Sequence, residues 1–217
     1  FLVATDYETW QESKRFHDSS ELSRELHIKF VGGGDGYSHF GTALAFAGWG
    51  YLGENKRAMR TASQIVEAML ATGAVVQIMK HVTGRQSPFK TDDTRTGRWE
   101  LFPEQVKYTQ NVQNYDAVPS GHIATAYSTF YVIKENYPEQ KWISWIGYPA
   151  IALISEGLAG TSIHWWSDIP IGIALGHTFA EIVVRRNNKN KDSEKSTAQI
   201  VPVWREEGPI MGVSWEW

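Results

Sequence analysis

The strongest pattern of apolar and polar positions lies in residues 54–82 and has the period of a helix. Ile65, Met69, Val76 and Met79 recur there at three- and four-residue steps. Such steps place the four side chains on one face of a helix, where they can be buried against the rest of the protein. The pattern therefore predicts one long amphipathic helix over residues 54–82.

Other segments share the helical period, and none of any length shows the strict alternation that is typical of β-strands. Residues 38–52 are small and apolar, which predicts a tightly packed, buried helix. The glycine cluster at residues 31–37 predicts a turn. The expected helices cover residues 19–27, 38–52, 54–82, 121–137, 140–157 and 164–186. This pattern predicts an all-α fold, a helical bundle with helical hairpins as its architecture.

Two polar segments separate or follow these helices. Residues 83–119 form a long, mostly irregular connection, and loops of this length inside a compact domain are usually functional or disordered. Residues 187–197, "NNKNKDSEKST", are charged and low in complexity, which predicts a flexible segment before a Trp-containing tail. The sequence thus predicts one helical domain over residues 1–186, followed by a flexible polar segment and tail over residues 187–217.

Composition narrows the classes of partner. The 217 residues are 42% hydrophobic and carry a formal net charge of -3 without a dense run of Lys and Arg, so we expect no nucleic-acid partner. Cysteine is absent, which excludes disulfides and thiolate metal sites. The mean hydropathy is -0.35, and Pro149 and Glu156 interrupt the apolar residues 143–163. Both features favour a soluble protein.

The location of the protein is less constrained by the sequence. Ten tryptophans and nine tyrosines leave peripheral contact with a membrane surface open. The first residue is Phe1 and not methionine, which indicates a processed mature chain or a trimmed one. We therefore expect a periplasmic or secreted protein, and the sequence predicts no oligomeric state.

The stretch "DAVPSGHIATA", residues 116–126, places Ser120, Gly121 and His122 where a helix is expected to begin. The first N–H groups of a helix have no partner inside it, and the helix dipole makes this end partly positive. A glycine lets a ligand approach the backbone, and a serine can cap the helix or donate its hydroxyl. The stretch therefore predicts an anion site with an imidazole beside it.

Lys80 extends the apolar stripe of the long helix, because it lies four residues beyond Val76. Its ammonium is expected to point inward, where an unpaired charge is costly and needs an anionic partner. A lysine near a helix end can also extend its ammonium back to water, which position alone favours. The pattern leaves these two placements open.

The stretch "SIHWWSD" places His164 and Asp168 four residues apart. On a helix the two side chains share a face, so the carboxylate can accept from one ring nitrogen while the other stays free. Such a pair is more often a surface contact or a core histidine whose hydrogen bonds are all made. Pro170 also interrupts helical hydrogen bonding nearby. The histidines expected on the surface or in the core are His17, His27, His39, His81 and His177.

Taken together, Lys80 with "GRQSP", then "PSGH", then His164 with Asp168 resemble the motifs of the type 2 phosphatidic acid phosphatase superfamily. This superfamily includes bacterial class A acid phosphatases, lipid phosphatases and vanadium haloperoxidases. The resemblance covers about residues 35–184, and "PSGH" is its most specific part. It implies a helical bundle whose three motifs build a phosphate site.

The resemblance also implies a role for each motif residue. His164 would attack phosphorus to form a phosphohistidine, Asp168 would fix its tautomer, and His122 would protonate the leaving oxygen. The groups that would hold the phosphoryl oxygens are Lys80, the Ser120 hydroxyl and the Gly121 backbone N–H. Fixed cations and N–H dipoles suit phosphoryl transfer, because negative charge gathers on the equatorial oxygens.

Two positions depart from the superfamily pattern. Ser87 stands where the first motif has an arginine, although Pro88 is kept, and Leu158 stands where the third motif has another. Two phosphate-binding guanidiniums are therefore missing, and each charge-assisted hydrogen bond is worth roughly 1.5–3 kcal/mol. We expect Arg85, which matches the Gly-Arg step of the superfamily, to bind phosphate. Arg98 is either a compensating phosphate ligand or a solvated loop charge.

The resemblance implies a phosphatase that needs no metal or other cofactor. Its substrate would be a phosphate monoester or diphosphate carried by a lipid, an isoprenoid or a small soluble molecule. The missing arginines leave a weak or silent phosphate- or phospholipid-binding module as an alternative. Another alternative is a haloperoxidase that uses vanadate as its cofactor. In a phosphatase, vanadate would act as an inhibitor instead. The last alternative is a zinc site made of His122, His164 and Asp168.

Overall fold

The computed structural model describes residues 2–91, 95–195, 199–205 and 208–214, with side chains described for residues 3–91 and 95–187. Its α-helices are α1 (Leu2–Asp18), α2 (Glu21–Gly34), α3 (Gly36–Leu52), α4 (Lys56–Thr83), α5 (Gln105–Gln110), α6 (Gly121–Asn136), α7 (Lys141–Gly160) and α8 (Asp168–Lys195). Two short 3-10 helices are η1 (Pro88–Lys90) and η2 (Val112–Asn114), and two strands are β1 (Gln199–Arg205) and β2 (Gly208–Ser214). The predicted all-α fold is confirmed, with a two-stranded antiparallel hairpin after the last helix.

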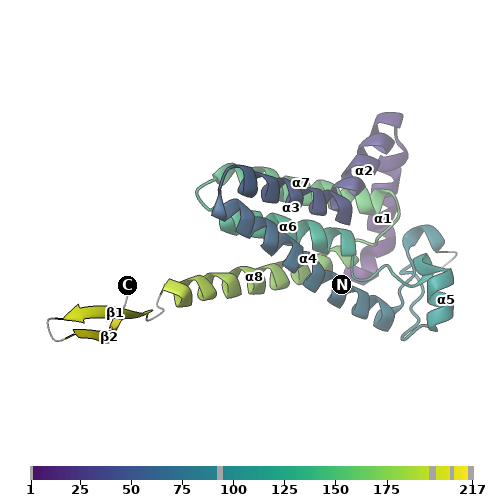
Figure 1. Ribbon diagram of the computed structural model, residues 1–217. Helices are drawn as coiled ribbons and strands as arrows, with labels where there is room; N and C mark the ends of the chain where they lie inside the picture. Colours follow the sequence, from purple (N-terminus) through teal and green to yellow (C-terminus); the bar gives the residue numbers. More distant parts are fainter. Residues whose placement is uncertain (1, 92–94, 196–198, 206–207, 215–217) are drawn as a thin grey trace.

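Helices α3, α4, α6, α7 and α8 lie roughly along one direction and form the bundle (Figure 1). One core cluster joins α3, α4, α6 and α8 around Ile65 and Val132, and a second joins α6 and α7 around Ile123 and Leu158. All four of these side chains are fully buried. The bundle therefore has α6 at its centre, in contact with both clusters.

Glycines bring the helices that carry the predicted motifs close together. A Cβ at Gly172 of α8 would lie 2.6 Å from the carbonyl oxygen of Ser120, and one at Gly176 would overlap the carbonyl of Ala124. Only hydrogen fits between these backbones, so α8 packs directly on α6. The Ser120 N–H donates to the Asp168 carbonyl at 3.2 Å. The first turns of α6 and α8 are thereby joined.

Helices α1 and α2 stand at one end of the bundle (Figure 1). The glycine cluster does not form the predicted turn, because α2 continues through Gly34 and only Asp35 separates it from α3. Helix α3 is also less buried than its composition predicted. Its buried residues are His39, Ala43 and Gly50. Leu44 and Leu52 are 72% and 83% exposed.

The predicted long helix over residues 54–82 is confirmed as α4, and the helices predicted at 121–137 and 140–157 are found as α6 and α7. The last predicted helix begins later than expected, at Asp168, because residues 161–167 form turns. It continues to Lys195, so the expected boundary at residue 187 falls inside α8. The predicted tail ends with residues 215–217, which lie outside the described residues.

The connection over residues 84–120 folds back on itself around Arg85. Gly84 ends α4 with a left-handed φ of 49°, and a Cβ there would overlap the Glu100 carbonyl. The backbone of Arg85 then pairs on one side with Trp99 and on the other with Asp116. The segment of the first motif therefore lies between the middle of the connection, at Trp99, and the residues just before α6, at Asp116.

Helix α4 has the length and composition to cross a membrane, and 39% of its apolar window is buried in the structure. The apolar residues 143–163, which Pro149 and Glu156 interrupt, fall mostly in α7. Length and composition are the only support for a membrane span, since the core helix of a soluble protein has the same properties.

Candidate active site

The predicted anion site lies at the first turn of α6. Ser120 caps this helix, since its hydroxyl accepts from the Ile123 N–H at 3.5 Å. In the described part of the chain, the N–H groups of Gly121 and His122 have no hydrogen-bond partner. A Cβ at Gly121 would lie 4.0 Å from Lys80 Nζ, so the lysine approaches the same turn. The helix start thus presents free donors beside a cation, as an anion requires.

Lys80 points inward and not to water. The residue is 7% exposed, and its Nζ donates to Asp116 Oδ2 at 3.3 Å. The expected anionic partner is therefore Asp116, which the long connection supplies. Of the three ammonium donors, only this one has a partner among the described residues, so two remain for an incoming anion.

His164 is held in one orientation by the backbone. Its side chain is 3% exposed, and Nδ1 lies 2.7 Å from the Ala117 carbonyl oxygen. A carbonyl only accepts, so Nδ1 carries the proton and Nε2 keeps its lone pair. Nε2 has no partner among the described residues, yet it is not among the buried unpartnered atoms. The free nitrogen is therefore accessible, as a nucleophile or base must be.

Arg85 lies in a closed ionic network behind His164 and is fully buried. Its guanidinium makes ion pairs with Asp6 at 2.7 Å and Asp168 at 2.5 Å. The remaining N–H groups donate to the Ser167 hydroxyl and, twice, to the Thr96 carbonyl. All five donors of the guanidinium are used.

These contacts give Arg85 and Asp168 roles that differ from the expected ones. Arg85 has no donor left for a phosphoryl oxygen, so it positions the loop that carries His164. Asp168 Oδ2 accepts from the Trp165 N–H at 2.8 Å and lies 3.7 Å from His164 Nδ1. The Ala117 carbonyl therefore sets the tautomer of His164, while the Asp168 carboxylate acts on the ring through its charge. The two residues do not share a helical face, because Asp168 begins α8.

His122 is the more exposed of the two site histidines, with 32% of its side chain accessible. Its Nε2 lies 3.3 Å from Asp35 Oδ1, the carboxylate between α2 and α3. Burial, with the charges of His164 and Lys80, lowers the pKa of His122 to about 4, against the opposite effect of Asp35 and Asp116. The ring is therefore neutral near pH 7 until an anion or lower pH favours protonation.

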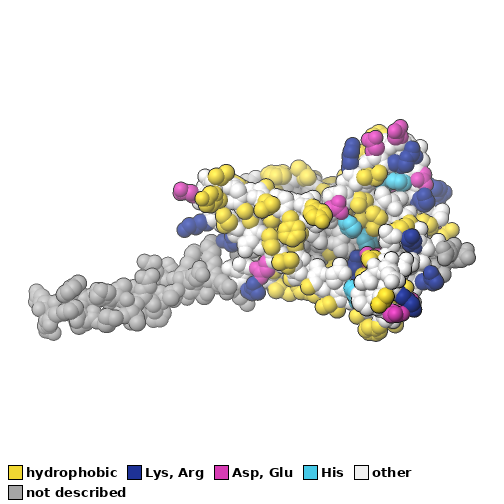
Figure 2. Space-filling view, turned by 45° about the vertical axis from the view of Figure 1, so that its right-hand side comes forward, with side chains coloured by type: hydrophobic (Ala, Val, Ile, Leu, Met, Phe, Trp, Pro, Cys, Tyr) yellow, Lys and Arg dark blue, Asp and Glu magenta, His cyan; other side chains and the backbone are white. Residues whose placement is uncertain are grey.

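The two imidazoles face one another. Their ring centroids are 5.8 Å apart, with an interplanar angle of 70°. Gly34 at the end of α2 lies directly against His122. A Cβ at Gly34 would be only 3.0 Å from His122 Cβ, so a glycine allows this close approach. Figure 2 shows histidine side chains at a hollow in this part of the surface. The structure thus brings together His122, His164 and Lys80, as the motif order predicted.

Among the described side chains, no arginine takes the place of the two that the superfamily pattern expects. Arg98 is exposed, and its backbone, not its side chain, pairs with Gln86. Ser87 is buried and its N–H donates to the Gln113 carbonyl, while Leu158 is fully buried in the α6–α7 core. The charges that shift the pKa of His122 are those of His164, Lys80, Asp35 and Asp116. Lys80 is the one permanent cation among them.

Sequence reasoning missed three acidic residues that the site uses. Asp6 is fully buried and accepts from Ser167 N–H at 2.9 Å as well as from Arg85. Asp35 and Asp116 lie beside His122 and Lys80. Asp116 opens the quoted stretch before "PSGH", so its position carried a signal. Asp6 carried none, because it lies in α1, far along the chain from every motif.

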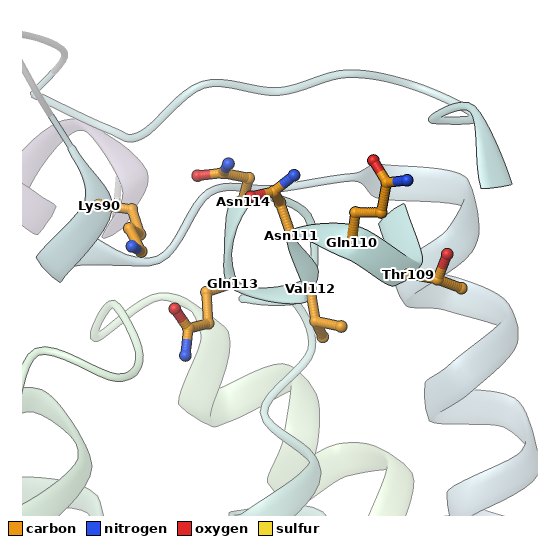
Figure 3. A pocket seen from close by; sticks show the side chains of 7 residues that line it. All are labelled: Lys90, Thr109, Gln110, Asn111, Val112, Gln113 and Asn114. Atoms are coloured by element: carbon orange, nitrogen blue, oxygen red, sulfur yellow. The ribbon is translucent and has the colours of Figure 1, made fainter. Parts of the chain in front are cut away.

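A separate polar pocket of about 410 Å³ lies along α5 and η2 (Figure 3). It is lined by Lys90 and residues 109–114 and includes none of the predicted site residues. Within the residues that the structure describes, no three His, Cys, Asp or Glu side chains are grouped as a metal site. The predicted site residues Lys80, His122 and His164 gather instead around the first turn of α6.

A helical bundle that gathers two imidazoles, a lysine and a helix start around one hollow defines a class of enzymes that handle phosphoryl groups. The family model of the PAP2 superfamily matches residues 61–192, and the chain belongs to this superfamily. Membership supports a phosphatase activity in general. The matched region contains Lys80, His122, His164 and Asp168, whereas Asp6 and Asp35 lie before it.

Two solved structures share the fold. LpxE from Aquifex aeolicus superposes with a TM-score of 0.60 at 15% identity, over 83% of this chain and 94% of that one. A transmembrane PAP2-type phosphatidylglycerolphosphate phosphatase from Bacillus subtilis gives 0.58 at 13% identity, over 86% of each chain. No curated protein sequence matches this chain. The two structures support the helical fold over most of the chain.

Proposed function

We propose that this protein is a metal-independent phosphatase that works through a phosphohistidine on His164. One observation carries the proposal: His164 Nε2 is free and accessible while Nδ1 is held by the Ala117 carbonyl. A histidine fixed in this tautomer presents a lone pair to phosphorus. The nearby helix start and Lys80 supply the donors that a phosphoryl group needs.

In the first step, His164 Nε2 forms a bond to phosphorus and the bond from phosphorus to the ester oxygen breaks. His122, protonated, gives its proton to the leaving oxygen, which departs as an alcohol. Lys80 and the N–H groups of Gly121 and His122 stabilise the charge on the equatorial oxygens. The imidazole gains positive charge, which the buried Asp168 carboxylate, 3.7 Å from Nδ1, stabilises.

In the second step, water attacks the phosphohistidine. His122 is now neutral and accepts a proton from that water, while the bond from phosphorus to Nε2 breaks. Inorganic phosphate leaves and His164 returns to its starting tautomer. Ser120 caps α6 and has no exposed surface, so in this scheme it holds the helix start in place for both steps.

We further propose that the protein associates with membranes and acts on a lipid phosphate. Helix α3 contains no Asp, Glu, Lys or Arg, and large apolar side chains are exposed on α3, α4 and α7. Among them, Leu44 is 72%, Leu70 62% and Trp145 80% exposed. Apolar surface of this extent marks an interaction face. Flotation of the purified chain with phospholipid vesicles tests this, and a chain that stays with the soluble fraction contradicts it.

A silent phosphate-binding module is the second candidate. It is favoured by the commitment of Arg85 to two carboxylates and by the acidic neighbours of the site, Asp35 and Asp116. Such a site has one fixed cation where the superfamily pattern expects several. This candidate predicts that phosphate binds without turnover.

Hydrolysis of an aryl phosphate in the presence of EDTA separates the candidates. If the protein is a phosphatase, we expect turnover that vanadate inhibits and that His164→Asn abolishes. With a radiolabelled phosphate ester, labelled phosphate should be found on a histidine after quenching without acid. His177→Asn is the matched control, because this histidine contacts Tyr127 and Tyr131 in α6, away from the site. Full turnover in His164→Asn contradicts the proposal, and binding without turnover supports the silent module.

A further inference from the structure

An apolar groove of about 480 Å³ lies beside the candidate active site, between α2, α3, α6 and α7. Its walls include Phe46 from α3, Phe130 and Ile133 from α6, and Ile146 and Ile154 from α7. None of the residues that line it is Asp, Glu, Lys or Arg. A concave surface without charge binds apolar ligands, because burying hydrocarbon there removes it from water.

The groove continues the active site along one face of α6. His122, Ala126, Thr129 and Ile133 follow one another at steps of four, three and four residues, so they form one stripe on this helix. The last three line the groove. At 1.5 Å per residue, the stripe extends about 16 Å from His122. A molecule lying in the groove therefore has one end at the imidazole.

Helices α2 and α7 connect the groove to the candidate active site on the side opposite α6. Gly33 and Ile154 line the groove, and a Cβ at Gly34 would meet Ile154 Cγ2 at 3.2 Å and His122 Cβ at 3.0 Å. The residue after Gly34 is Asp35, which lies against His122 Nε2. One layer of residues thus forms both the end of the groove and the wall of the site.

Two buried polar atoms on the groove walls have no hydrogen-bond partner among the described residues. They are His39 Nε2 and Thr129 Oγ1, from side chains that are 8% and 4% exposed. Burial lowers the pKa of His39 to about 4, so the ring is neutral near pH 7 and one of its nitrogens keeps a lone pair. A buried polar group without a partner is costly, and both residues line the groove.

We propose that this groove binds the hydrocarbon chain of a lipid phosphate and that His39 and Thr129 select a chain bearing a hydroxyl or amide N–H. The inference rests on the proposed function, since it places the phosphoryl group at His164. The O–H or N–H of the ligand donates to His39 Nε2, in the tautomer that leaves this nitrogen its lone pair, or to the Thr129 hydroxyl oxygen. The groove then contributes affinity in proportion to chain length, and the polar pair contributes the preference among chains.

Titration calorimetry with n-alkylphosphonates tests the groove without requiring turnover. We expect the affinity of the full chain to rise about fourfold per added methylene until the groove is filled. Ala150→Phe, which places a ring in the groove, is expected to remove this dependence while aryl phosphate turnover stays unchanged. Thr42→Phe, on the α3 wall, is the second variant should Ala150→Phe not fold.

Ala47→Phe is the matched control for these variants. Ala47 lines a different apolar groove, of about 650 Å³ between α3 and α4, so its substitution is expected to leave the chain-length dependence intact. An affinity that does not change with chain length overturns the groove assignment, as does an unchanged dependence in both groove variants. If the wild-type protein does not hydrolyse the aryl phosphate, the proposed function is contradicted instead. The phosphonate titration still tests the groove, because it measures binding and needs no turnover.

An octylphosphonate with a mid-chain hydroxyl tests the polar pair. Thr129→Val is expected to weaken this ligand roughly 3- to 10-fold and to leave the unsubstituted octylphosphonate unchanged. Thr125→Val, one turn earlier in α6 and outside the groove lining, is expected to change neither. Equal affinities of the hydroxylated ligand for wild type, Thr129→Val and His39→Phe overturn the selection by these residues.

Discussion

The two imidazoles of the candidate site are held in contrasting ways. His164 is 3% exposed, bonded to a backbone carbonyl and backed by the buried charges of Arg85, Asp6 and Asp168. His122 is 32% exposed, and its Nε2 lies 3.3 Å from the Asp35 carboxylate. One side of the site is fixed by several interactions, and the other by few.

This difference fits the separate tasks of the two rings. A nucleophile benefits from a fixed tautomer and direction, because orientation lowers the entropic part of the barrier. A proton donor that later acts as an acceptor must change its charge, and partial exposure lets water and substrate adjust its pKa. The fixed side therefore sets whether the reaction occurs, and the adjustable side sets its dependence on pH and leaving group.

Replacement of Arg85 is the most severe way to break the fixed side. Arg85→Met leaves Asp6 and Asp168 buried without a counter-charge, and removing one partner of a buried ion pair costs about 3–5 kcal/mol. We expect that loss in the free energy of unfolding, measured by urea denaturation, together with loss of phosphatase turnover.

Arg98→Met is the matched control, because this arginine is exposed. Its free energy of unfolding is expected to change by less than about 0.5 kcal/mol. A stable Arg85→Met protein with full turnover contradicts the positioning role of Arg85. Lower turnover in a stable Arg98→Met protein identifies Arg98 as a compensating phosphate ligand.

His122→Gln separates the adjustable side from the fixed one. Loss of a general acid typically costs about 10²–10⁴-fold in rate, so we expect that decrease in kcat for an alkyl phosphate. An aryl phosphate with an acidic leaving group needs little protonation and should lose much less. Steady-state kinetics on both substrates measure the contrast, and equal losses on both argue against proton donation by His122.

Lys80→Met tests the charge that serves both imidazoles. A charge-assisted hydrogen bond contributes about 1.5–3 kcal/mol, so kcat/KM is expected to fall roughly 10- to 100-fold. Inorganic phosphate should inhibit this variant more weakly. Asp116→Asn keeps the lysine and removes its partner, and it is expected to strengthen phosphate inhibition. Unchanged inhibition in both variants contradicts the contact of Lys80 with the phosphoryl group.

Asp35→Asn gives the smallest expected effect and refines the adjustable side. The pKa of His122 is lowered to about 4, chiefly by burial, and Asp35 acts in the opposite direction. The protonated ring is lost as pH rises above that pKa, so kcat/KM should increase as pH falls from about 7 towards 5. Asn at this position lowers the pKa further, which shifts the profile to lower pH. An identical profile in the variant argues against Asp35 as the partner of His122.

Most of the fold followed from the spacing of apolar residues. The long helix α4 and the helix opened by Ser120 are consequences of local period, because side chains at three- and four-residue steps share a face. The same period left the direction of Lys80 open, and the structure places its ammonium inward, on Asp116. Helix α1 and the continuation of α2 through its glycines did not follow. Glycine is costly in a helix unless close packing requires it, and that packing, on Ile154 and His122, comes from distant segments.

The site divides in the same way. The sequence by itself determined the chemical groups, since "PSGH", Lys80 and His164 are local patterns whose residue types suit a phosphoryl group. Only the tertiary structure decided their partners: Ala117 for His164, Asp116 for Lys80, and Asp6 with Asp168 for Arg85. A hydrogen bond or ion pair depends on a distance of a few ångströms between atoms that lie far apart along the chain. Residue type and spacing carry no record of that distance, because it is set by how the helices pack.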